Sequence, residues 1–141
     1  MLRQQHAWVT PLNDAAVSST GMLREADFQV AFCQDILERT PEHSEALALL
    51  GEAYTSRGDF KKGLETDLQL SRLKPDSGIV HYNLACSYAL MGMKDEALAT
   101  LRHAVALGYS DRDHLCNDKD LESLRDDPRY HELIEQWPVA K

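Results

Sequence analysis

The chain has 141 residues, of which 43% are hydrophobic and 27% charged, a composition typical of one globular domain. Fifteen Lys and Arg against 23 Asp and Glu give a net charge of −8, which disfavours nucleic acid and anionic membrane surfaces as partners because both attract basic faces. No apolar stretch reaches the roughly 20 residues that cross a bilayer, and the first residues lack the apolar run of a secretory signal.

The three cysteines, Cys33, Cys86 and Cys116, are an odd number at wide spacing. They form neither a disulfide framework nor a metal-ligand pattern, so we expect a reducing, cytoplasmic location. Cys33 and Cys86 fall within apolar stripes, and we expect both to be small core side chains rather than reactive thiols.

Residues 1–22 are predicted to form an amino-terminal arm that is partly ordered and helical only in part. Trp8, Val9 and Leu12 are candidates for docking this arm on the rest of the chain. The alternative is a flexible segment that becomes ordered on a partner. The remaining residues, 23–141, are expected to form a single domain.

The segment 27–41 is predicted to be a helix because its apolar residues recur at helical spacing. Those apolar residues are Val30, Cys33, Ile36 and Leu37. We interpret this helix as the second one of a degenerate repeat at residues 23–43. The matching first helix would fall at residues 10–20, where the match is poor because of Pro11 and several small polar residues.

The next part of the chain repeats at an offset of 34 residues, which pairs Leu50 with Leu84, Tyr54 with Tyr88 and Gly58 with Gly92. Within each unit the apolar residues recur every three or four positions, as in a helix. The two glycines interrupt this pattern at equivalent places, where glycine closes the last turn of a helix. We therefore predict two helical hairpins, with helices at 44–57, 60–73, 78–91 and 94–107.

These units resemble tetratricopeptide repeats. The resemblance rests on Leu47, Leu50, Gly51, Tyr54, Gly58 and Pro75 in the first repeat, 44–77, and on Leu84, Ala85, Tyr88, Gly92, Ala97 and Ala104 in the second, 78–111. The chain departs from the family pattern at Gly63, Asp67, Leu70, His81 and Tyr109. The resemblance covers about residues 25–136 and implies an all-α fold, a right-handed superhelix (solenoid) of antiparallel helix pairs.

Residues 112–137 are not a regular repeat and are predicted to cap the last hairpin. They resemble a closing segment often seen after tetratricopeptide repeats in bacterial proteins. Helices are predicted at about 111–116, 118–124 and 127–136. Asp126 and Asp127 precede Pro128, an arrangement that suits the start of a helix. The side chains expected to cover the end of the stack are Leu115, Leu121, Leu124, Tyr130, Leu133 and Ile134.

In tetratricopeptide repeats the first helices of the hairpins line a concave groove, and the resemblance implies a set of partner-binding residues here. The set is Glu45, Ala48, Glu52 and Thr55 in the first repeat and Ile79, Tyr82, Asn83 and Cys86 in the second. Asn83 is expected to hydrogen-bond the main chain of an extended peptide, and Tyr82 to supply a rigid apolar wall. The alternative is that Asn83 only braces the neighbouring hairpin.

Some members of the family bind acidic carboxyl-terminal tails through a clamp of Lys, Asn and Arg. Ala48 stands here where a clamp lysine would stand, and Glu52 stands where an asparagine would. We therefore expect no such clamp, and an acidic groove would prefer a neutral or basic segment.

The sequence contains no phosphate-binding glycine loop, no G-x-S-x-G elbow and no HExxH motif. His114, Cys116 and His131 are the candidate metal ligands, but His114 and Cys116 point apart if they lie on a helix. We expect no metal or cofactor. The carboxylates expected to form a solvated face are Glu25, Glu38, Glu42, Glu65 and Glu96.

The chain is therefore predicted to be a protein-interaction module, not an enzyme, that binds a peptide or helix of a partner protein in the groove. The alternative is a structural scaffold that self-associates, as a homodimer, through the arm or the helix at 24–39, or a subunit of a larger assembly. An incompletely covered end helix favours this alternative because its apolar face lacks a partner.

Overall fold

The computed structural model describes residues 14–137, and the side chains from residue 24 onward. This part of the chain consists of helices and short connections without a strand, which confirms the all-α helical-repeat prediction. The elements are α1 (Asp14–Arg39), α2 (Ser44–Ser56), α3 (Phe60–Leu73), α4 (Gly78–Leu90), α5 (Lys94–Ala106), α6 (Arg112–Asn117), the 3-10 helix η2 (Lys119–Leu124) and α7 (Pro128–Glu135).

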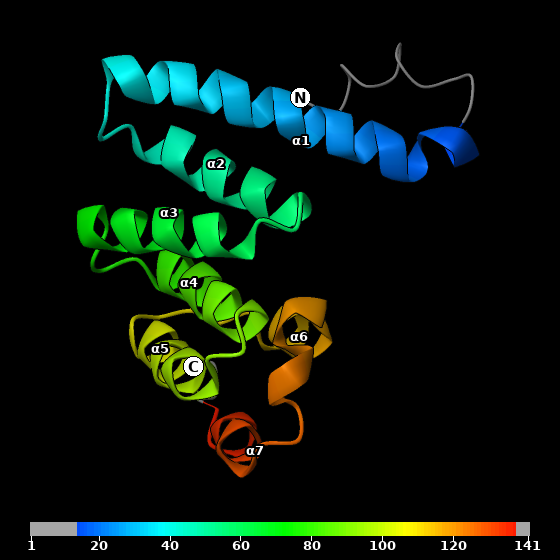
Figure 1. Ribbon diagram of the computed structural model, residues 1–141. Coiled ribbons are helices and arrows are strands. Elements are labelled where there is room, and N and C mark those ends of the chain that lie inside the picture. The colour runs from blue at the N-terminus through cyan, green and yellow to red at the C-terminus, as the bar shows by residue number, and fades with distance from the viewer. Residues whose placement is uncertain (1–13, 138–141) are drawn as a thin grey trace.

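Each helix from α1 to α5 packs on the next one in the chain, so the helices form a stack of layers (Figure 1). The closing segment, which comprises α6, η2 and α7, lies at the far end of this stack from α1. It reaches back to the repeats, because η2 contacts α4 and both η2 and α7 contact α5. Stacking of this kind buries the apolar face that one hairpin leaves open.

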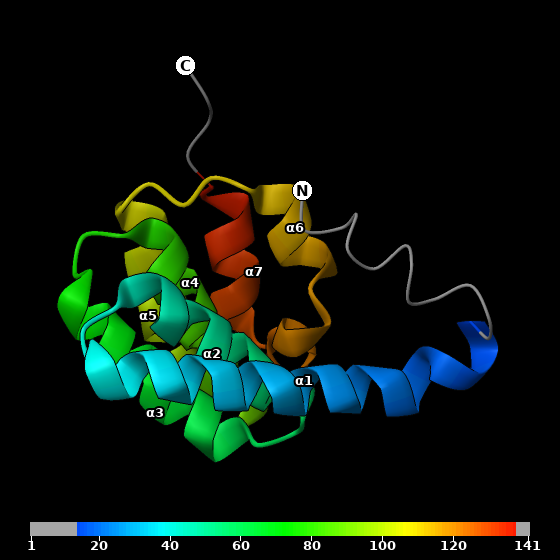
Figure 2. The ribbon, with the colours of Figure 1, turned by 90° about the horizontal axis from the view of Figure 1, so that it is seen from above.

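The first helix is longer than the sequence predicted. α1 begins at Asp14 and continues for 26 residues without interruption. Figure 2 shows its amino-terminal part extending past the rest of the stack. Residues 14–20 therefore continue α1 and do not form the separate first helix considered at 10–20. Trp8, Val9 and Leu12 lie outside the described residues. Among the described helices, none is both long and apolar enough to span a membrane.

The predicted turns and the predicted start of the last helix are confirmed. Gly58 and Gly92 have φ of 84° and 77°, the left-handed conformation that glycine adopts without strain. The Ser77 side chain accepts a hydrogen bond from the backbone of Val80 at the start of α4. Asp127 does the same for Arg129 at the start of α7, with Pro128 in the first turn.

The interior of the stack is formed by small and large side chains together. Cys33 is buried between α1 and α2 with Ala46 and Leu50, as expected of a core cysteine. Ala85 of α4 and Ala97 of α5 are fully buried, which lets the two helices approach closely. These small residues of the repeat pattern thus lie at the contact between the two helices.

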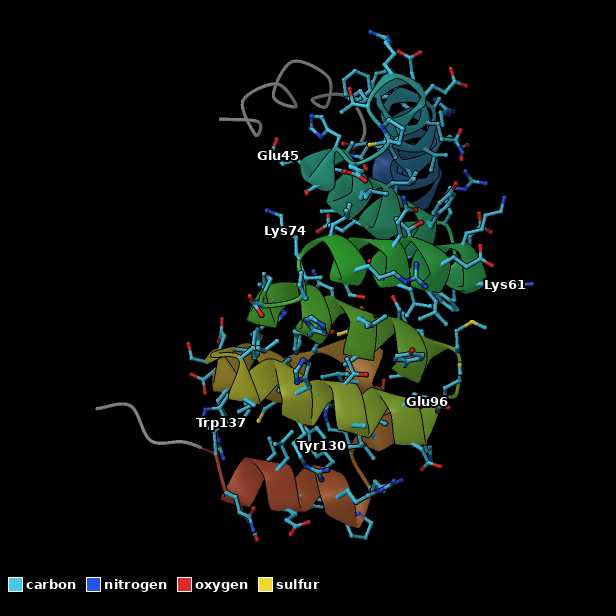
Figure 3. The ribbon with its side chains drawn as sticks, turned by 90° about the vertical axis from the view of Figure 1, so that its left-hand side faces the viewer. Glu45, Lys61, Lys74, Glu96, Tyr130 and Trp137 are labelled. Carbon is cyan, nitrogen blue, oxygen red and sulfur yellow. The ribbon has the colours of Figure 1, made fainter. Side chains whose placement is uncertain are left out.

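The closing segment covers the apolar end of the second hairpin. Leu115, Leu121 and Leu124 have no exposed surface, and they pack in one cluster with side chains of α4 and α5. Tyr130 of α7 joins this cluster and points toward α5 (Figure 3). Leu133 and Ile134 are only partly buried at its edge. Apolar side chains of this segment thus pack over the end of the second hairpin.

Candidate functional site

A groove of about 370 Å³ lies between α2 and α4, the first helices of the two repeats. Residues of α3 also line it, and residues of α6 and η2 and the junction between them line one end. Six of the eight residues predicted from the sequence line it: Ala48, Glu52, Thr55, Tyr82, Asn83 and Cys86. Glu45 and Ile79 are exposed on the same two helices but do not line the groove. Figure 3 shows Glu45 at the beginning of α2.

Several lining residues were not predicted from the sequence. They lie outside α2 and α4, or at positions of these two helices that the repeat pattern does not assign to the groove. They are Gly51, Ser56, Asp67, Leu70, Ser87, Leu90, His114, Asp118 and Asp120. The acidic ones matter most, because they set the charge of the groove. The only signal for Asp118 and Asp120 was their place in the closing segment.

Tyr82 connects the groove wall to the closing segment. Only 2% of the residue is exposed, and its ring stacks on Tyr109 with the centroids 4.2 Å apart. The hydroxyl donates a hydrogen bond of 2.5 Å to Asp118 Oδ2. Burial, together with the neighbouring Cys86 and Asp118, raises the pKa of this hydroxyl far above its ordinary value. The ring therefore supports the wall from behind and offers little surface to a ligand.

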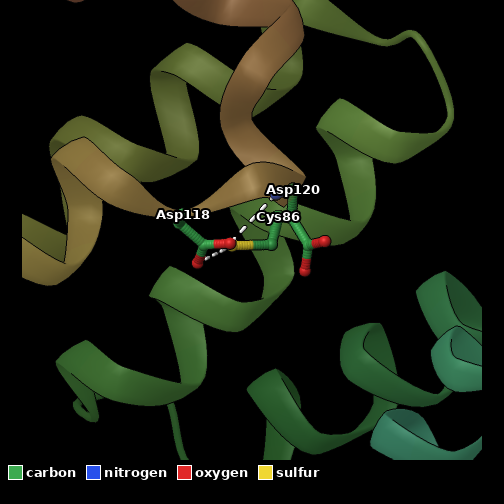
Figure 4. Close-up of side chains that lie close together, drawn as sticks. All are labelled: Cys86, Asp118 and Asp120. Atoms are coloured by element: carbon green, nitrogen blue, oxygen red, sulfur yellow. Dashed lines mark hydrogen bonds between the residues drawn. The ribbon is translucent and has the colours of Figure 1, made fainter. Parts of the chain in front are cut away.

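Asp118 lies where several polar groups converge. Its Oδ2 accepts from the Tyr82 hydroxyl, lies 3.7 Å from Cys86 Sγ and lies 3.4 Å from His114 Nε2. Its Oδ1 accepts the backbone N–H of Asp120 at 3.0 Å. Figure 4 shows the side chains of Cys86, Asp118 and Asp120 close together. This carboxylate therefore joins α4 to the closing segment at one end of the groove.

Cys86, Asp118 and Asp120 are close enough to hold a metal ion, because one ligand atom from each lies within 4.8 Å of the others. Burial, followed by the charges of Asp118 and Asp120, raises the pKa of the Cys86 thiol. Burial and Asp118 also raise the pKa of Asp120. These shifts favour the protonated thiol, which lies within hydrogen-bonding distance of Asp118 Oδ2.

Of the three candidate metal ligands, Cys116 and His131 both lie beside Tyr130, whereas His114 lies beside Tyr82 and Asp118. His114 lies against the Tyr82 ring, with the ring centroids 5.7 Å apart, and beside Asp118. Cys116 is close enough to Tyr130 to raise its pKa, although burial is the larger cause. The ring of His131 lies edge-on to that of Tyr130.

Asp67 is a buried carboxyl group of the groove lining, at a position where the family pattern has an aromatic residue. Only 7% of the residue is exposed. The Ser87 hydroxyl donates a 2.5 Å hydrogen bond to its Oδ2, and a Cβ at Gly51 would lie 2.6 Å from its Oδ1. Burial raises the pKa of Asp67 to about 6, the Ser87 bond opposes this shift and the charge of Glu52 adds to it. Gly51 thus provides the space that Asp67 needs.

Two known proteins are similar to parts of this chain, while no protein-family model matches it. One is a chloroplastic protein of Arabidopsis thaliana, with 28% identity over 90 residues, which are 62% of this chain and 27% of that protein. The other is Superkiller complex protein 3 of Mus musculus, with 34% identity over 70 residues, which are 50% of this chain and 4% of that protein.

The chain therefore spans about a quarter of the first relative's length and a small fraction of the second's. Together with the stacked helices, these similarities support a helical-repeat module. The five carboxylates predicted to form a solvated face are all exposed, and none of them lines the groove.

Proposed function

We propose that this chain is a non-catalytic module of the tetratricopeptide kind that holds a segment of a partner protein in the groove between α2 and α4. The observation that carries the proposal is the groove itself, because matching helices of two repeats supply both of its walls. The 34-residue repeat and the partial similarity to a protein named for a complex agree with it.

The side chains of the groove support binding rather than catalysis. The raised pKa of Cys86 keeps its thiol protonated, and its polar neighbour is the carboxylate of Asp118, which already accepts the Tyr82 hydroxyl. Asn83 is exposed on the wall and offers both a donor and an acceptor to a peptide main chain. Ala48 on α2 has a small side chain, which leaves space for the bound segment.

The proposal predicts that peptides selected by the wild-type chain lose affinity when the groove is narrowed. Twelve-residue peptides would be selected from a random display library, resynthesised with a fluorophore and measured by fluorescence anisotropy. We expect Ala48→Gln combined with Asn83→Ala to weaken their binding about tenfold, the effect of losing one or two well-formed contacts. Tyr82 is left intact because it is buried, so that Tyr82→Ala would destabilise the fold as well as change the groove.

The matched control is Ala99→Gln combined with Gln69→Ala, which makes comparable changes at exposed sites outside the groove. Unchanged binding by this control, together with the loss in the groove variant, supports the assignment. Equal affinity of both variants for the selected peptides, or failure to select any peptide, shows that the groove is not the binding surface.

A second candidate function is self-association, which one observation on α1 favours. Phe28 is 68% exposed and Phe32 is 52% exposed, and their rings stack with the centroids 6.0 Å apart. We expect a second copy of the chain to cover this pair if the protein is a scaffold, because a large apolar pair on a helix surface favours an interface. Sedimentation velocity would then show a dimer that Phe28→Ser with Phe32→Ser dissociates. A wild-type monomer at every concentration removes this candidate.

A further inference from the structure

The groove is lined by four carboxyl groups that come from three parts of the chain. Glu52 belongs to α2, Asp67 to α3, and Asp118 and Asp120 flank the start of η2. Among its described lining residues there is no Lys or Arg, and His114 is the one basic side chain. A concave surface with charges of one sign concentrates its electrostatic potential. The negative potential of the groove therefore comes from its own lining residues, and not only from the net charge of the chain.

Two arginines that could balance this negative charge form their ion pairs with carboxylates outside the groove. Arg57 pairs with Asp27 and Asp59, and Arg129 pairs with Asp95 and Asp127. Within the described part of the chain, no Lys or Arg forms an ion pair with a groove carboxylate. His114 Nε2 lies 3.4 Å from one of these carboxylates, Asp118, so most of the negative charge of the groove is left for a ligand to neutralise.

Asp67 is the one buried residue among these four carboxyl groups. The residue is more than nine-tenths buried, and its Oδ2 is satisfied by Ser87. Its Oδ1, beside Gly51, accepts no hydrogen bond from the described residues, although the carboxyl lines the groove. This oxygen is not among the buried side-chain atoms that lack a partner in the described part of the chain, so it faces the groove, where a donor that enters could bond it.

The available donors and acceptors favour an organic cation over a metal ion. The Cys86 thiol lies 3.7 Å from Asp118 Oδ2 and donates a weak hydrogen bond to it. Asp118 already accepts hydrogen bonds through both of its oxygens. A guanidinium group carries five N–H donors in a planar fork, which suits several carboxylates spread around a hollow.

We propose that the partner segment is basic, and that one of its arginine side chains enters the groove between the Glu52–Asp67 pair and the Asp118–Asp120 pair. This inference rests on the proposed function and names the chemistry of the partner. In this arrangement Asn83 hydrogen-bonds the main chain of the bound segment, and the carboxylates bind its positively charged side chain.

The test compares each selected peptide with a copy in which arginine is replaced by citrulline, which has nearly the same shape but no charge. We expect citrulline to weaken binding to the wild-type chain about tenfold, as for loss of a charge-assisted hydrogen-bonded pair. In the variant Glu52→Gln with Asp120→Asn, the same replacement should change the affinity less than about threefold. Asp118 is kept in this variant because it holds Tyr82.

The matched control is Glu65→Gln with Glu96→Gln, which removes the same charge from exposed positions outside the groove. It should retain the tenfold effect of citrulline if recognition is local. An equal citrulline effect in both double variants overturns the inference, as does selection of peptides without basic residues. If such neutral peptides still lose affinity with Ala48→Gln and Asn83→Ala, the proposed function stands and only the basic partner is wrong.

Discussion

Replacing Leu121 with alanine is expected to lower the free energy of unfolding by about 3 kcal/mol, the usual cost of removing a fully buried leucine side chain. Leu121 lies in η2, has no exposed surface and packs in the cluster formed by α4, α5 and the closing segment. The short η2 cannot be stable on its own, so a cavity at this position also loosens the cap. Urea denaturation of the full chain measures the loss.

The matched control is Leu49→Ala, which removes the same atoms from a side chain that is 44% exposed on α2. We expect this variant to lose less than about 1 kcal/mol, because much of the leucine already contacts water. A similarly small loss for Leu121→Ala would mean that the closing segment is not part of the cooperative core. The cooperatively unfolding part of the stack would then end at α5.

The repeats could be predicted from the sequence because each signal is local and occurs twice. Gly58 and Gly92 mark turns that only a left-handed residue completes without strain, and both have positive φ. Pairs such as Gly51 and Ala85 recur at one offset because the same helix contact recurs. Since the groove is formed by equivalent helices, six of its lining residues followed from the family resemblance.

Features that depend on contacts between distant segments could not be predicted in the same way. Asp118 reaches Tyr82, 36 residues earlier, through packing of the closing segment on α4. Asp67 departs from the repeat pattern, and its partner Ser87 lies in the next repeat. The start of α1 was missed because the segment 18–21 consists of two serines, a threonine and a glycine, which are poor helix formers, although the helix continues through them.

Replacing Asp67 with asparagine is expected to raise the free energy of unfolding by about 2 kcal/mol at pH 8, less than the roughly 3 kcal/mol that the whole pKa shift represents. The folded state raises the pKa of Asp67 from 3.8 to about 6, mainly through burial. A group with a raised folded pKa stabilises the fold fully below its unfolded pKa, and this contribution is lost as pH rises through about 6. The amide oxygen that the substitution introduces can still accept the hydrogen bond from Ser87.

The advantage of Asp67→Asn should therefore shrink between pH 7 and pH 4, where the wild-type carboxyl takes up its proton. Urea denaturation at several pH values measures this difference between the two proteins. Asp76→Asn is the matched control, because Asp76 is exposed in the turn before α4, and it should shift stability little at any pH. A variant that is less stable than the wild type at pH 8 would show that the ionised carboxylate is stabilised by its surroundings. In that case the surroundings of Asp67 already stabilise its negative charge, and this residue gives no support for a cation in the groove.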